Sequence, residues 1–152
     1  MAVKEDLPTV LSLLEENSLP ADGMRQHLGT ILVVRKSSEV VGNAALEPYA
    51  GAALLRSVAV RGELRGKGLG RRLVDTALEL AAEHEASNVY LLTEEAEDFF
   101  ARLGFRRISR TDVGRASPEV IRSVQFTSAC PESAQAMSLS LNEAPADNHY
   151  RL

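Results

Sequence analysis

Residues 65–72 of the chain read Arg-Gly-Lys-Gly-Leu-Gly-Arg-Arg, and they lie between the apolar run 53–60 and the helical pattern 69–85. Glycines at alternating positions let a backbone approach a ligand closely, and the first N–H groups of a helix have no partners within the helix. Basic side chains crowd this helix start, where the positive end of the dipole usually attracts acidic ones. The stretch therefore predicts a cradle for a bound phosphate. The alternative interpretation is a solvated basic turn.

The composition predicts one soluble domain with a buried core, since 45% of the 152 residues are hydrophobic and 25% are charged. The formal net charge of -4 argues against a nucleic-acid partner. No apolar run is long enough to cross a membrane, so no membrane partner is expected. The single cysteine, Cys130, excludes an internal disulfide and a cysteine-based metal cage. We expect a cytoplasmic protein without a metal site.

Hydrophobic periodicity and turn residues predict an α/β fold. Helices are expected at residues 6–17, capped by Asp6, and at 69–85, 94–103 and 117–123. Strands are expected at residues 31–35, 40–46, 53–60, 89–92, 105–109 and 134–141, the last one at a sheet edge. A long helix separates the third strand from the fourth, which makes these two strands parallel neighbours, whereas short turns make the first three antiparallel. Residues 142–152 read as a polar tail.

Two familiar phosphate motifs fail against the spacing of the cradle. A P-loop needs a hydroxyl residue after its lysine, but Gly68 follows Lys67. A dinucleotide fingerprint needs a third glycine where Arg71 stands, and an acidic residue about 20 positions further on at a strand end.

The pattern that remains, R-x-x-G-x-G at Arg65, Gly68 and Gly70, resembles the acetyl-CoA-binding motif of the GNAT acetyltransferases. Residues 99–105, Phe-Phe-Ala-Arg-Leu-Gly-Phe, are similar to the F-Y-x-x-x-G-F signature of that family. Residues 44–49 and 91–93 resemble its amino-acid N-acetyltransferase branch, which includes the acetylglutamate synthase domain and a subgroup associated with arsenic resistance. The resemblance implies a single GNAT domain over residues 1–141, with a mixed, mostly antiparallel sheet of six or seven strands flanked by helices.

The resemblance also implies which residues hold the cosubstrate, acetyl-CoA. The main chain of the third strand should pair with the pantetheine arm, and the cradle should bind the pyrophosphate. The implied cofactor-binding residues are Val58, Ala59, Val60, Arg65, Gly66, Lys67, Gly68, Leu69, Gly70, Arg71, Phe99, Phe100 and Arg102. The acetyl group would lie where strands 53–60 and 89–92 separate.

Acetyl transfer needs a neutral amine and a departing thiolate, and the sequence offers candidates for both tasks. Many family members carry a tyrosine that protonates the thiolate, but the matching residue here is Phe100. Tyr49, Ser57 and Tyr90 are the alternative hydroxyls, and Glu47 is the candidate base, acting directly or through water. Each of these side chains could instead be ordinary strand structure.

The acceptor is expected to be a small amine such as an amino acid, because an α-amino group is already partly neutral at pH 7. Arg56, within an apolar strand, is the candidate partner for an acceptor carboxylate, and Thr93 and Cys130 complete the candidate substrate-binding set. We therefore expect an acetyl-CoA-dependent N-acetyltransferase that works through a direct ternary complex, and a homodimer by family resemblance. The alternatives are a catalytically weak acyl-CoA sensor and a protein-modifying acetyltransferase.

Overall fold

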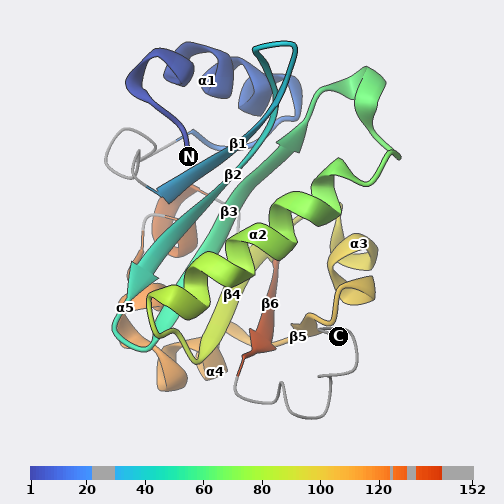
Figure 1. Ribbon diagram of the computed structural model, residues 1–152. Helices are drawn as coiled ribbons and strands as arrows, with labels where there is room; N and C mark the ends of the chain where they lie inside the picture. The colour runs from blue at the N-terminus through green and yellow to red at the C-terminus, as the bar shows by residue number, and fades with distance from the viewer. Residues whose placement is uncertain (22–29, 124, 130–132, 142–152) are drawn as a thin grey trace.

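A mixed sheet of six strands forms the centre of the computed structural model (Figure 1). The structure describes residues 1–21, 30–123, 125–129 and 133–141, so Cys130 and the expected tail 142–152 lie outside it. The strands are β1 (Ile31–Lys36), β2 (Glu39–Tyr49), β3 (Ala52–Val60), β4 (Asn88–Thr93), β5 (Arg106–Arg107) and β6 (Gln135–Ser140). Their order is β1-β2-β3-β4-β6-β5, and only β3 and β4 pair in parallel. The predicted fold class and the parallel pair are confirmed.

Three details of the predicted strands are wrong. The expected edge strand, β6, lies between β4 and β5, because β5 adds to its outer side. The expected strand 105–109 is reduced to the two residues of β5, and the chain then enters helix α4, which the sequence analysis did not predict. The expected strand 40–46 is longer in the structure, since β2 continues to Tyr49, so the turn falls on Ala50 and Gly51, where Gly51 has φ +72°.

The helices largely follow the hydrophobic periodicity. They are α1 (Leu7–Glu16), α2 (Leu69–Glu83), α3 (Glu97–Arg102), α4 (Arg110–Ala116) and α5 (Pro118–Ile121), with single turns η1 (Lys4–Asp6) and η3 (Gly62–Leu64) and a π-helical turn η4 (Gln125–Ala129). α3 begins later than expected because the hydroxyl of Thr93 accepts a hydrogen bond from the Ala96 N–H at 3.0 Å. Asp6 occupies the N-cap position of α1, but its carboxylate binds the Val3 N–H and Arg35 instead of the helix.

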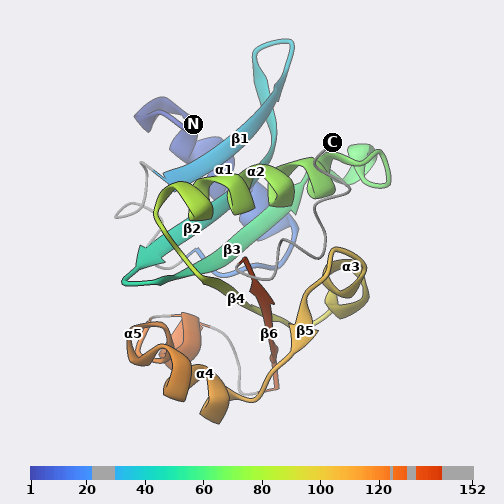
Figure 2. The ribbon, with the colours of Figure 1, turned by 60° about the horizontal axis from the view of Figure 1, so that its bottom comes forward.

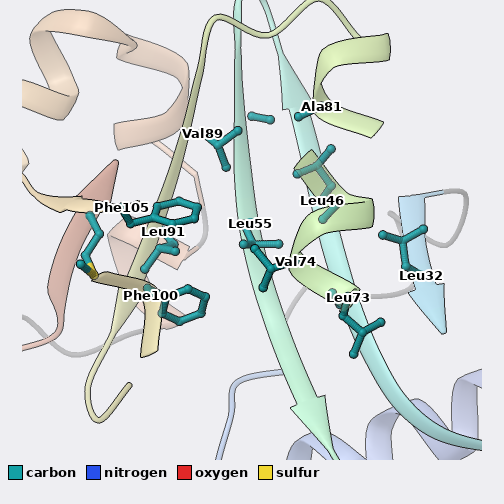
Figure 3. Close-up of a cluster of buried hydrophobic side chains, with 14 of the residues drawn as sticks. Leu32, Leu46, Leu55, Leu73, Val74, Ala81, Val89, Leu91, Phe100 and Phe105 are labelled. Atoms are coloured by element: carbon teal, nitrogen blue, oxygen red, sulfur yellow. The ribbon is translucent and has the colours of Figure 1, made fainter. Parts of the chain in front are cut away.

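Two layers of helices cover the sheet. α2 crosses one face, where its buried side chains pack on β2 and β3 around Leu46, Leu55 and Val74 (Figure 3). On the other face α1 packs on β1 and β2, while α4 and α5 pack beside β4 and β6 (Figure 2). Residues 54 and 56 of β3 face this second layer, between the cluster around α1 and the cluster around α4 and α5.

The parallel pairing of β3 with β4 is short. Its register comprises Ala52 with Asn88, Ala53 with Val89 and Leu54 with Tyr90, and no later pair joins the two strands in the described chain. Beyond Leu54, β3 therefore separates from β4, and the edge of Val58, Ala59 and Val60 that faces away from β2 leads to the loop before α2. This opening is where the sequence analysis placed the acetyl group.

A β-bulge interrupts β3 beside this opening. Asn43 pairs with Ala59 and Ala45 with Arg56, so Ser57 and Val58 both lie opposite Ala44. Ser57 has φ +61°, a left-handed conformation that is unfavourable for a residue with a Cβ atom. The extra residue resets the alternation of β3, so that Leu55 and Val58 pack with the α2 layer while Ala59 packs with α1.

Candidate active site

The glycine-rich cradle has the open backbone that its sequence predicts. Gly66 and Gly68 have φ +81° and +83°, and a Cβ atom built on either one would meet nothing within 4 Å. Gly68 is the N-cap of α2 and contributes no side-chain cap, so it leaves the first N–H groups of the helix available to a ligand. The backbone here is shaped to receive an anion at the positive end of the α2 dipole.

The charges around the cradle are exposed and basic. Lys67 and Arg72 take part in no ion pair among the described residues, while Arg71 lies 3.9 Å from Asp75 on the next turn of α2. The guanidinium of Arg65 donates to the side-chain oxygen of Asn17 at the end of α1, and this hydrogen bond fixes the position of the Arg65 side chain. The cradle thus offers free cations to a phosphate, with Arg65 in a structural contact.

The two phenylalanines of α3 have different roles. A Cβ atom at Gly70 would lie 3.3 Å from Cζ of Phe99, so Phe99 contacts the start of α2 and closes one side of the cradle. Phe100 is buried in the core and packs edge-on against Phe105, with ring centroids 5.7 Å apart. Phe100 is therefore a core side chain, without a hydroxyl to donate a proton.

A buried polar cluster occupies the sheet face opposite α2. Nη1 of Arg56 lies 2.9 Å from Oε2 of Glu47, and the hydroxyl of Tyr49 donates to Oε1 of the same carboxylate at 2.7 Å. Nε of Arg56 donates to the Ser57 hydroxyl at 3.1 Å, and Nη2 donates to the Pro20 carbonyl at 3.3 Å. Four of the candidate site residues, two from β2 and two from β3, thus form one hydrogen-bonded unit.

Gln125 belongs to this cluster, although the sequence analysis missed it. With the amide oxygen turned toward Arg56, it accepts from Nε at 3.1 Å and from Nη2 at 2.9 Å. Gln125 is the first residue of the π-helical turn η4, which follows α5. A π-turn is a common device at functional sites, but no sequence pattern predicted it here.

The phenol of Tyr49 is held in its neutral form. Burial is the main cause that raises the pKa of Tyr49, and the hydrogen bond to Glu47 and the negative charge of Glu47 raise this pKa further. Burial also raises the pKa of Tyr90, which lies on β4 at the last paired position beside Leu54. Both phenols are therefore donors, not phenolates, at neutral pH.

Thr93 and Arg102 have no contact with the cluster among the described interactions. Thr93 ends β4 and caps the approach to α3, and Arg102 is exposed on α3. Cys130 lies outside the described residues. In the described part of the chain, no group of three His, Cys, Asp or Glu side chains is placed to hold a metal ion. None of the helices that were described is long and apolar enough to cross a membrane.

A mixed sheet that opens beside a glycine-rich helix start is the architecture of a coenzyme A-dependent acyltransferase. The chain belongs to the family described as Acetyltransferase (GNAT) domain, which it matches over residues 27–107, more than half of its length. The matched segment includes β2, β3, the cradle and α2, so the family recognised from the sequence is confirmed.

Two curated proteins are similar to this chain. An uncharacterised N-acetyltransferase of Chlorobaculum tepidum is 34% identical over 86 residues, which are 56% of this chain and 55% of that protein. An amino-acid acetyltransferase of Mycobacterium tuberculosis is 40% identical over 76 residues, which are 49% of this chain and 43% of that protein. The match thus spans about half the length of these relatives.

Solved structures share the fold over most of the chain. A Mycobacterium tuberculosis protein in complex with CoA and NLQ has a TM-score of 0.75 and 23% identity, covering 92% of this chain and 96% of that one. N-acetylglutamate synthase of Neisseria gonorrhoeae, complexed with coenzyme A and N-acetyl-glutamate, has a TM-score of 0.75 and 20% identity, covering 92% and 34%. At these identities the likeness establishes the fold.

Proposed function

We propose that this protein is an N-acetyltransferase that moves the acetyl group of acetyl-CoA to the amine of a small molecule, an amino acid or an amino-acid analogue. The observation that carries this proposal is the buried Arg56–Glu47 pair, in which Arg56 lies on β3 beside the opening toward β4 and Glu47 lies on the neighbouring strand β2. A charged, hydrogen-bonded cluster at the proposed reaction centre suits a polar acceptor that carries both an amine and a carboxylate.

The cradle and β3 would hold the cosubstrate. Gly66 and Gly68 leave room for a pyrophosphate against the start of α2, and the free edge of β3 over Val58–Val60 offers main-chain groups to an extended pantetheine arm. Arg56 lies four residues before the end of β3, roughly 13 Å along the strand. Acetyl-CoA supplies the activated thioester. The protein would hold its pyrophosphate at the cradle and its acetyl end beside Arg56.

Tyr49 and Glu47 are arranged to remove a proton from the acceptor amine. An amine N–H can donate to Oη of Tyr49 while the Tyr49 hydroxyl donates to Oε1 of Glu47, as it already does at 2.7 Å. The Tyr49 hydroxyl would give its proton to Glu47 and take the proton that leaves the amine, so the phenol is neutral again after the transfer. In this scheme Glu47 is the base and Tyr49 is the relay.

The leaving thiolate places a smaller demand on the site. A thiol with a pKa near 8.5 departs as thiolate at pH 7 at a cost of about 2 kcal/mol in driving force. The reaction therefore proceeds without a tyrosine at Phe100. The presence of Phe100 where many family members have a tyrosine also favours the second candidate function, an acyl-CoA-binding sensor with little turnover.

Arg56 can recognise an acceptor carboxylate without giving up its pairing with Glu47. Its Nη2 and Nε atoms contact neutral acceptors, the Pro20 carbonyl, the Ser57 hydroxyl and the Gln125 amide. A carboxylate oxygen forms a stronger, charge-assisted bond with a guanidinium than these neutral oxygens do. An acidic acceptor would therefore displace the Gln125 or Pro20 contact.

The test is an acetyl-transfer assay across a panel of amino acids and simple amines. Turnover is monitored by the release of the coenzyme A thiol and by the mass of the acetylated product. We expect turnover with at least one α-amino acid and none with the decarboxylated amine of the same side chain. Tight coenzyme A binding without turnover on any amine would overturn the enzyme proposal in favour of the sensor. Acetylation restricted to lysine peptides would favour a protein-modifying enzyme.

The proposal also covers the domain organisation, the cellular location and the oligomeric state of the enzyme. We propose a single catalytic domain over residues 1–141, located in the cytoplasm and assembled as a homodimer. Its single cysteine suits a reducing compartment, and the short edge strand β5 offers a surface to a second copy. Sedimentation equilibrium of the purified protein tests the dimer.

A further inference from the structure

We propose that Asn43 is a positioning residue that holds the β3 bulge in its strained conformation and so keeps Arg56 and Ser57 in place. This role rests on the proposed function, because it concerns the geometry of the same site. Asn43 was not singled out by any sequence motif. Its assignment comes from one buried hydrogen bond and from the register around it.

The side chain of Asn43 is committed to the bulge. Asn43 is completely buried on β2, and its Nδ2 atom donates to the carbonyl oxygen of Ser57 at 2.7 Å. Ser57 is the residue with φ +61° in the bulge, and buried backbone carbonyls such as this one require a hydrogen-bond donor. The Asn43 amide supplies that donor from the neighbouring strand.

The surroundings of Asn43 do not otherwise favour an amide. Its strand neighbour Ala45 and its cross-strand partner Ala59 belong to the apolar cluster under α1. Its Oδ1 atom is buried and has no hydrogen-bond partner among the described atoms. Burying a half-satisfied amide among apolar side chains is unfavourable, so the Nδ2 bond to Ser57 is the feature that accounts for this residue.

The bulge matters because it fixes the polar cluster. The register passes from Ala59 to Arg56 across the bulge, which leaves Arg56 on the face of Glu47 while Val58 turns to the face of α2. The Ser57 hydroxyl accepts from Nε of Arg56 at 3.1 Å within the same turn. A bulge that relaxed toward regular pairing would shift these side chains, and small shifts of positioning groups lower kcat strongly.

The variant Asn43→Val separates positioning from packing. Valine fills a buried strand position without a donor, and it removes the unsatisfied Oδ1 atom. We expect a melting temperature equal to or above that of the wild type, together with a kcat about tenfold lower and a KM for acetyl-CoA within twofold. The control Val40→Ala removes volume from the same apolar cluster at the far end of β2, and we expect it to lower the melting temperature with kcat unchanged.

A double variant tests the link to Ser57. Glycine adopts positive φ without strain, so a bulge with Ser57→Gly no longer depends on the amide donor. Adding Asn43→Val to Ser57→Gly should change kcat by less than twofold, against about tenfold in the wild-type background. Equal losses in both backgrounds would overturn the proposal, as would an Asn43→Val variant with wild-type kcat.

Hydrogen exchange keeps this test independent of the proposed activity. In Asn43→Val the amides of residues 56–60 should exchange about tenfold faster than in the wild type, whereas Val40→Ala should leave their rate unchanged. A wild-type protein that acetylates no amine would refute the proposed function, and the exchange result would still decide the role of Asn43. Unchanged exchange in Asn43→Val would overturn that role.

Discussion

The guanidinium of Arg56 and the carboxylate of Glu47 approach to 2.9 Å, with side chains that are only 2% and 4% exposed. These two residues carry different proposed tasks, recognition of the acceptor and removal of its proton, yet they form one buried ion pair. Because each charge neutralises the other, removing either partner leaves an uncompensated charge in the protein interior. A loss of activity after a single substitution must therefore be separated from a loss of stability.

The first prediction concerns this pair. Glu47→Gln and Arg56→Met should each lower the free energy of unfolding by about 3–5 kcal/mol, because each leaves one buried charge unpaired. The double variant should lose less than the sum of the single losses. Urea unfolding of all four proteins measures the coupling. Additive losses would show that the pair contributes no interaction energy.

The second prediction concerns the cradle. Gly68→Val should abolish coenzyme A binding without unfolding the protein, because a side chain at φ +83° fills the space above the start of α2. Gly51→Val is a matched control, since Gly51 has φ +72° and equally open surroundings in the β2–β3 turn. Titration calorimetry should find normal coenzyme A affinity in the control. Retained binding in Gly68→Val would refute the cradle assignment.

Gly70 gives a third test of the same surface through a different mechanism. Its missing Cβ would lie 3.3 Å from Cζ of Phe99, so Gly70→Val should push the Phe99 ring away from α2. We expect weaker coenzyme A binding, by about tenfold, and partial recovery when Phe99→Ala is added to make room. Calorimetry of the single and double variants measures this recovery, and a double variant as weak as Gly70→Val would contradict the proposed contact.

The fourth prediction concerns pH and Tyr49. Since the folded-state pKa of Tyr49 is raised above the ordinary value near 10, its contribution to stability is complete below pH 10 and is lost as pH rises further. We expect the difference in absorbance at 295 nm between the wild type and Tyr49→Phe, which reports on the Tyr49 phenol alone, to show ionisation only above pH 10. Ionisation of that phenol at or below pH 10 would show that Tyr49 is neither buried nor bound to Glu47 in solution.

The fifth prediction concerns the acid limit of stability. The hydrogen bond from Arg35 is the main cause that lowers the pKa of Asp6, and the Val3 N–H adds to it. Because the pKa of Asp6 is lower in the folded protein, the Asp6 carboxylate stabilises the fold at pH values above its unfolded-state pKa near 3.8. This contribution is lost as the pH falls through the pKa of Asp6 in the folded protein. Asp6→Asn should therefore be less stable than the wild type at pH 7, with a gap that narrows below about pH 4. The exposed Asp98→Asn variant is the control, measured by urea unfolding.

Local patterns in the sequence predicted most of the fold. Periodic leucines and alanines fix α2, and β-branched runs between short turns fix β1 to β3, because these signals come from neighbouring residues. The place of β6 inside the sheet could not be predicted, since it depends on the short strand β5 adding to its outer side. α4 was missed because Gly114 weakens an already short helical pattern, while Ser109 caps it by accepting from the Asp112 N–H.

The candidate site was predicted in its parts but not in its assembly. Arg56 stood out as a cation within an apolar strand, whereas Glu47 at the end of the second strand and Tyr49 after it were candidates because they lie near the site that the family resemblance implies. Their mutual hydrogen bonds depend on strand register and on the bulge at Ser57, which no local pattern announces. Gln125 reaches the cluster from a distant π-turn, so only the folded chain could reveal it.

The brief pairing of β3 with β4 also bears on cooperativity. Three residue pairs join the half of the sheet with β1 to β3 to the half with β4, β6 and β5, and the hydrophobic cluster around Leu55, Leu91 and Met137 packs across the same junction. A thioester lying in the opening would touch both halves at once. In thermodynamic terms the proposed cosubstrate is a cross-link between the two halves, so its binding should raise the free energy of local unfolding around the opening.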